Sequence, residues 1–113
     1  MITISAVLDP SGLLKSCDVR GHAGAGKRGN DLVCAAVSVL TRTALSTLSE
    51  AAGLSVKAQA PERGVFKLEA GAENAEGRIF LKAAGAFLLG GLQSVAREYP
   101  ENCTIEIITE RRN

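Results

Sequence analysis

The chain has 113 residues, the common size of one globular domain, and 46% of them are apolar, enough to build a buried core. Its formal net charge of +1 excludes a strong electrostatic attraction to nucleic acid or to an anionic membrane. The three cysteines, with no secretory leader recognised before them, favour reduced thiols in the cytoplasm. We therefore expect a single domain over residues 1–113 of a cytoplasmic protein.

Two strands are expected at the start of the chain. Residues 2–8 alternate apolar and polar side chains, which is typical of a half-buried strand. Turn-forming residues follow at 9–12, and a second strand from Leu13 to about Gly21 would pair back as a hairpin. His22, the only histidine of the chain, comes directly after this strand. The end of a sheet is a rigid place from which to present its side chain.

Residues 23–30 are predicted to form a loop. Gly24, Gly26 and Gly29 make this stretch unsuitable for a regular element and lower the cost of changing its conformation. We expect the loop to close over an extended peptide and to be the moving part of a substrate site.

A helix is expected after this loop. Asn30 or Asp31 can cap its first N–H groups, and Gly53 is a natural stop, so the helix would run to about Ala52. Apolar residues recur along it at helical spacing: Val33, Val37, Leu40, Ala44 and Leu48. We predict that this stripe faces the core.

Three further elements complete the predicted fold. Two strands over about 54–60 and 64–70 precede a second helix over 75–98, and a last strand covers 103–108. The apolar stretch 80–92 within that helix is too short to span a bilayer and is predicted to be buried. Its predicted core face consists of Ile79, Ala83, Phe87, Gly91 and Val95. The order ββαββαβ indicates an α/β protein of the α+β type, a two-layer sandwich with two helices on one face of a mixed or antiparallel sheet.

Cys34 and His22 are the candidate catalytic pair. Cys34 is predicted to lie in the first turn of the first helix, where the positive end of the helix dipole favours a thiolate. His22 could act as the base, which completes the minimum set of groups for nucleophilic catalysis. Backbone N–H groups at the start of the helix, that of Cys34 included, could stabilise an oxyanion. The purely structural alternative is that Cys34 is packed in the core and that His22 is a histidine at the end of a strand.

Two polar residues lie near Cys34 at helical spacing. Asp31 is either an N-cap or a group that orients His22. Ser38 can donate a hydrogen bond to the thiol or to the carbonyl four residues before it. The other cysteines, Cys17 and Cys103, lie in predicted strands and are expected in the core. One histidine and three scattered cysteines do not build a zinc site, so we expect no metal and no cofactor.

The segment Gly21-His22-Ala23, the eight-residue loop and residues 31–38 resemble the signature of the ribosomal-processing cysteine protease family, Prp. The resemblance implies a bacterial, cytoplasmic, homodimeric cysteine endopeptidase that removes a short N-terminal extension from protein twenty-seven of the large ribosomal subunit. It implies that Cys34 is the nucleophile and His22 its partner. The accompanying motif positions are Gly21, Asp31 and Ser38.

The loop departs from the family pattern at two positions. Ala25 stands where the family often has an aromatic residue, and Lys27 stands where it has acidic residues. These two differences affect how the extension peptide fits the loop. They leave the catalytic pair unchanged. Two other functions remain open: a non-catalytic ribosome-associated module that binds a peptide, and a redox-sensing thiol protein with a resolving cysteine close to Cys34. The small and apolar residues of the second helix also favour a homodimer.

Overall fold

The computed structural model describes residues 1–21, 28–62 and 64–112, with the side chains of residues 28–31 outside that description. The elements of this described part follow the chain in one order: β1 (Ile2–Leu8), β2 (Leu14–Arg20), α1 (Arg28–Glu50), β3 (Leu54–Gln59), β4 (Val65–Ala72), α2 (Ala75–Glu98) and β5 (Cys103–Thr109). The predicted order ββαββαβ is confirmed.

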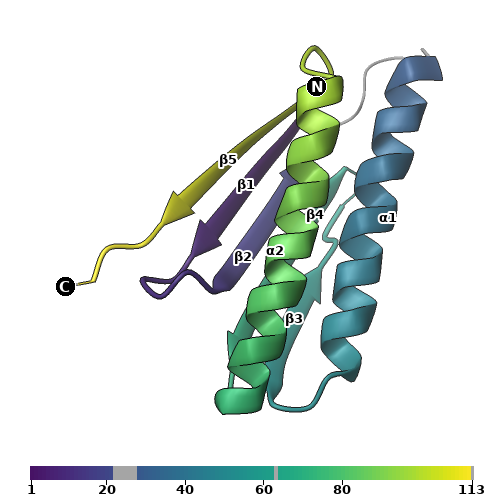
Figure 1. Ribbon diagram of the computed structural model, residues 1–113. Helices are drawn as coiled ribbons and strands as arrows, with labels where there is room; N and C mark the ends of the chain where they lie inside the picture. Colours follow the sequence, from purple (N-terminus) through teal and green to yellow (C-terminus); the bar gives the residue numbers. More distant parts are fainter. Residues whose placement is uncertain (22–27, 63, 113) are drawn as a thin grey trace.

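All five of these strands form one mixed sheet in the order β3-β4-β2-β1-β5. β1 pairs with β2, β2 with β4 and β4 with β3 in antiparallel fashion, whereas β1 and β5 are parallel. Both helices lie on the same face of the sheet, with α2 across its middle and α1 beside α2 on the side of β3 (Figure 1). The fold is the predicted two-layer α+β sandwich.

The core lies between the sheet and the helices, and the alternation of side chains along each strand directs apolar residues into it. In β1, Ile2, Ile4 and Ala6 are buried, whereas Thr3 and Ser5 are exposed. A polar outer face is expected for an antiparallel region covered on one side only. The predicted alternation over residues 2–8 is therefore confirmed.

The predicted apolar stripe of α1 faces the core. Its members are either buried or packed against the buried cluster: Val33, Val37, Leu40, Ala44 and Leu48. The helix ends at Glu50, two residues earlier than predicted. Gly53 has a φ of 79°, a left-handed conformation suited to glycine at a turn that leads from the helix into β3.

α2 has the predicted bounds, but the prediction of its core face was wrong. Ile79 and Phe87 are 74% and 78% exposed, Ala83 is exposed as well, and Gly91 and Val95 are half-buried. The buried residues are Gly77, Leu81, Gly85, Leu88, Leu89 and Leu92. Apolar residues recur at helical spacing on both sides of α2, and the side with four leucines and two close-packing glycines buries more apolar surface against the sheet.

By length and composition alone, two segments are long and apolar enough to cross a membrane, Leu32–Glu50 and Ala75–Glu98. The prediction that the stretch 80–92 is too short to span therefore does not extend to α2 as a whole. In the structure both helices pack against the same sheet, which provides a protein partner for one side of each. The stretch 80–92 is buried only in part, because Phe80 and Phe87 are 39% and 78% exposed.

Gly21 ends β2 in a conformation that glycine takes without strain. Its φ is 102°, and its N–H donates to the carbonyl oxygen of Gly64 at 2.8 Å. A Cβ atom at this position would collide with the carbonyl oxygen of Met1. The chain that leaves β2 is thus fixed between the N-terminus and the residue that precedes β4.

We expect Gly21→Ala to lower the free energy of unfolding by about 2–4 kcal/mol, because it combines a positive φ with a backbone collision. Gly12→Ala is the matched control, since Gly12 also has a positive φ (92°) but nothing lies within 4 Å of its Cβ position. That control should cost about 1–2 kcal/mol. Urea unfolding followed by circular dichroism measures the loss in the free energy of unfolding for both variants. Equal losses would show that the backbone collision at Gly21 has no cost.

Candidate active site

The two predicted catalytic residues belong to segments that meet at one end of the molecule. The residue after β2 contacts the N-terminus, and α1 begins at the same end (Figure 1). His22 follows Gly21 directly and lies outside the described residues, as do Gly24 and Gly26 of the predicted substrate loop. The topology therefore brings the end of β2 and the first turns of α1 to the same end of the sheet.

α1 begins earlier than predicted. It starts at Arg28, so Gly29 belongs to the helix rather than to the loop, and Asn30 and Asp31 lie inside the helix rather than at its cap. Glycine costs about 1 kcal/mol in a helix, and the apolar stripe of this 23-residue helix outweighs that cost. The predicted moving loop is thereby shortened to residues 23–27, which lie outside the described residues.

The earlier start changes the place of Cys34. Counted from Arg28, Cys34 is the seventh residue and lies in the second turn, not in the first. The electrostatic effect of a helix N-terminus is concentrated in the first turn. It therefore gives no reason to choose Cys34 as the reactive cysteine. Within an α-helix the N–H at this position bonds to the carbonyl four residues earlier, which removes it from the predicted oxyanion-binding groups. The first four residues of α1 are the ones whose N–H groups have no partner inside the helix.

Of the three cysteines, Cys34 alone is not fully buried. Cys17 and Cys103 are 0% and 1% exposed, as expected for core residues. Burial, together with the nearby Asp18 carboxylate, raises the pKa of the Cys17 thiol to about 11, and burial raises the pKa of the Cys103 thiol. Cys34 is half-buried against the core. Cys34 is therefore the one cysteine with appreciable exposed surface in the described part of the chain.

Neighbouring polar residues on α1 have different surroundings. Ser38 lies one turn after Cys34 and is exposed. The backbone of Asp31 lies in the helix three residues before Cys34, and its side chain is outside the description. Thr41 was not considered in the sequence analysis. It is buried, and its Oγ1 donates to the carbonyl oxygens of Val37 at 2.9 Å and of Ser38 at 3.2 Å. These bonds satisfy Thr41 within the helix, so its role is structural.

The described residues hold no group of three or more His, Cys, Asp and Glu side chains that could bind a metal ion. The start of α1, at this end of the molecule, carries the half-buried thiol of Cys34. The strand that leads to the only histidine of the chain ends at the same end. This arrangement is suited to thiol chemistry on a substrate that approaches from that end of the sheet.

Comparison with solved structures shows the same fold in other proteins. SMU.848 from Streptococcus mutans has a TM-score of 0.82 and 28% identity, and the match covers 97% of this chain and 96% of that one. The ribosomal processing protease Prp from S. aureus, in complex with a substrate peptide, has a TM-score of 0.79 and 20% identity, over 95% of this chain and 99% of that one. The same protease with a covalently linked product peptide has a TM-score of 0.79 and 22% identity, with the same coverage.

A search of curated proteins gives no match. The family described as cysteine protease Prp, in contrast, matches the sequence over residues 1–104. This match takes in both helices and the start of the last strand, and it includes every residue predicted for the site. With 104 of its 113 residues matched, the chain belongs to the cysteine protease Prp family.

Proposed function

We propose that this cysteine protease is a cytoplasmic endopeptidase that removes the N-terminal extension from protein twenty-seven of the large ribosomal subunit. Cys34 is the nucleophile and His22 is the base. The observation that carries the proposal is that Cys34 is the one cysteine outside the buried core in a chain of a cysteine protease family. A non-catalytic peptide-binding module would not need a reachable thiol.

The reaction follows the usual course of thiol proteolysis. His22 takes the proton of the Cys34 thiol, and the sulfur attacks the scissile carbonyl carbon to form an S–C bond. The C–N bond then breaks as His22 returns the proton to the departing amine. Water, activated by His22, hydrolyses the thioester and releases the new carboxylate. Free N–H groups in the first turn of α1 are suited to stabilise the oxyanion, at about 3 kcal/mol for one such donor.

Two findings support a peptide substrate. The S. aureus relative was crystallised with a substrate peptide, and again with a covalently linked product peptide. In this chain Cys34 is half-buried and Ser38, one turn further along α1, is exposed, so both have surface that a peptide could contact. Ala25 and Lys27, which depart from the family pattern, lie outside the described residues. We expect them to change the preferred sequence of the extension rather than the chemistry.

Mass spectrometry of the ribosomal protein, incubated with and without the protease, tests this function. We expect the wild type to remove the extension and Cys34→Ala to be slower by at least about a thousandfold. Cys103→Ala is the matched control, because Cys103 is buried in β5 and should be dispensable for cleavage. If the wild type leaves the ribosomal protein uncut, the proposed identity of the substrate is wrong. Undiminished cleavage by Cys34→Ala would refute the nucleophile.

Alkylation by iodoacetamide should modify Cys34 faster than the other cysteines at pH 7.5. Cys17 and Cys103 are buried, and their raised pKa values keep both thiols protonated well above neutral pH. Peptide mapping after short exposure measures the three rates separately. Faster labelling of Cys17 or Cys103 would show that the reachable thiol has been misassigned.

His22→Ala should lower kcat/KM by about 100- to 10,000-fold, the usual contribution of a general base. Thermal unfolding of the variant should match that of the wild type, because a residue that only transfers protons does not hold the fold together. Steady-state kinetics and circular dichroism melts measure the two effects. A variant that unfolds while its residual folded fraction stays fully active would indicate a structural histidine instead.

We also propose a homodimer formed through the exposed side of α2. Ile79 and Phe87 on this side are 74% and 78% exposed, and Phe80 beside them is 39% exposed. Large apolar side chains gathered on one surface usually mark an interface. A second copy of the chain would bury the same side of its own α2 in return, as a two-fold interface requires.

Sedimentation equilibrium at micromolar concentration should therefore give twice the monomer mass of 11.7 kDa. Phe87→Glu should shift the protein to monomers by placing a charge in the apolar contact. Ile108→Glu is the control, since Ile108 is 50% exposed on β5 and away from this surface. A monomeric wild type, or a Phe87→Glu variant that remains dimeric, would contradict this interface.

A further inference from the structure

One hydrogen bond joins β2 to the residue before β4, beyond the last residue pair of their ladder. At the end of the sheet where α1 begins, that last pair is Arg20 with Val65. The N–H of Gly21 then donates to the carbonyl oxygen of Gly64 at 2.8 Å, which continues the same antiparallel register by one position. β2 is therefore attached to the β4 side of the sheet through the residue that directly precedes His22.

The peptide group between Gly64 and Val65 is held from both of its sides. Its carbonyl oxygen accepts the bond from Gly21. Its N–H belongs to Val65 and donates to the carbonyl oxygen of Glu62 at 3.2 Å. The N–H and the C=O of a trans peptide point in opposite directions within one plane. The bond to Glu62 therefore also helps to fix the direction in which the carbonyl oxygen points toward β2.

Gly64 has a backbone conformation that this arrangement requires. Its φ is 82°, in the left-handed region where an L side chain is strained. The bond from Val65 to Glu62 spans four residues, as in a β-turn, and Gly64 is the third of them. Glycine reaches a positive φ at this turn position freely, and asparagine does so more readily than other residues. A change of φ at Gly64 would rotate the next peptide group and move its carbonyl oxygen away from Gly21.

The opposite side of Gly21 is closed by the start of β1. A Cβ atom on Gly21 would collide with the carbonyl oxygen of Met1. Close contact on one side and a hydrogen bond on the other fix where the end of β2 lies. Consecutive Cα atoms are about 3.8 Å apart, so a shift of Gly21 carries the backbone of His22 with it. A general base acts only within hydrogen-bond reach of its proton, and a displacement of about 1 Å can cost about 100-fold in rate.

We propose that Gly64 is a positioning residue for His22. It acts through its hydrogen bond with Gly21, which places the end of β2 relative to the first turns of α1, where Cys34 lies. The role rests on the proposed function of His22 as the base. It gives the turn between β3 and β4 a part in catalysis, although this turn lies about 30 residues beyond Cys34 in the sequence.

Gly64→Ala tests this role, because alanine disfavours a positive φ without adding a large group. We expect kcat for cleavage of the ribosomal protein to fall about 10- to 100-fold and KM to change less than about twofold, because the base is displaced while the substrate contacts remain. Gly64→Asn should restore kcat to within about threefold of the wild type. Alkylation of Cys34 by iodoacetamide near neutral pH should slow with Gly64→Ala as well. That rate needs no peptide substrate.

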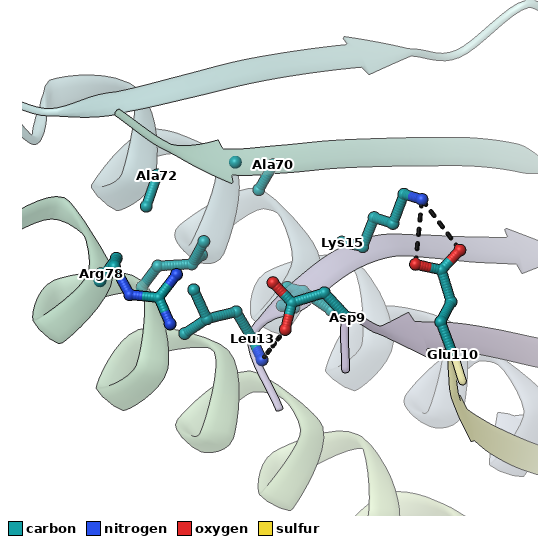
Figure 2. Close-up of a pocket in the computed structure, with 10 residues that line it drawn as sticks. Asp9, Leu13, Lys15, Ala70, Ala72, Arg78 and Glu110 are labelled. Atoms are coloured by element: carbon teal, nitrogen blue, oxygen red, sulfur yellow. Dashed lines mark hydrogen bonds and ion pairs between the residues drawn. The ribbon is translucent and has the colours of Figure 1, made fainter. Parts of the chain in front are cut away.

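Gly12→Ala is the matched control at the opposite end of β2. Gly12 also has a positive φ, 92°, in the turn between β1 and β2. Bonds to Asp9 hold that turn: its carbonyl oxygen accepts from the N–H of Gly12 at 2.9 Å, and its Oδ1 accepts from the N–H of Leu13 at 3.0 Å (Figure 2). The strain of alanine is therefore similar, but it acts far from His22. We expect kcat to stay within about twofold of the wild type.

A double variant separates positioning from a general loss of structure. If Gly64 acts through His22 alone, adding Gly64→Ala to His22→Ala should not lower kcat further, because the imidazole is already gone. Alanine at a positive φ costs only a small part of the stability of a domain, and circular dichroism melts show whether each variant is folded at the assay temperature.

Four results would each overturn the proposal: wild-type kcat with Gly64→Ala, an equal loss with Gly12→Ala, no rescue by Gly64→Asn, or the same further loss in the His22→Ala background. Failure of the proposed substrate is seen separately, as a wild type that leaves the ribosomal protein uncut, and the alkylation rates of Cys34 then still test Gly64. If His22→Ala leaves the alkylation rate of Cys34 unchanged, His22 is not the base, and the role of Gly64 is refuted with it.

Discussion

The close contact of α2 with its neighbours is the constraint on which the rest of the structure depends. A Cβ atom added at Gly85 would lie 3.0 Å from Cβ of Leu14 in β2, and one added at Gly91 would lie 2.8 Å from Cδ2 of Leu40 in α1. At these two glycines α2 therefore packs closely against β2 on one side and α1 on the other. Because α1 packs against α2, and Cys34 itself packs against the buried cluster, the turn that bears Cys34 is attached to the core.

This contact also explains which part of the fold was predictable. Alternation in residues 2–8 and the stripe on α1 indicated the correct faces, because each has apolar residues on one side only. α2 has apolar residues on two sides: Ile79 and Phe87 are eight residues apart and Leu81 and Leu88 are seven apart, and both spacings are helical. Periodicity identifies such a helix and its bounds but not its buried side. That choice depends on which side can approach the sheet closely, and this is a tertiary property.

The site was predictable in its residues more than in its geometry. The spacing from His22 to Cys34 and the match over residues 1–104 point to the same family. The helix start was placed too late, because glycine at position 29 and the capping residues after it suggested a loop. A long apolar helix can extend through a glycine, and a prediction from local propensity does not include that tertiary gain. The β-bulge at Lys15, where β1 and β2 change register, had no signal in the sequence, because strand register depends on tertiary pairing.

Covalent trapping tests the central claim, that Cys34 is the nucleophile of a peptide-cleaving site, most directly. A chloromethyl ketone built on the residues before the scissile bond alkylates a cysteine that is positioned for attack, and intact-protein mass spectrometry counts the adducts. We expect one adduct per chain, located on Cys34 by peptide mapping, that forms much more slowly with His22→Ala. An adduct on Cys17 or Cys103, or one on Cys34 that forms equally fast without His22, would contradict this account.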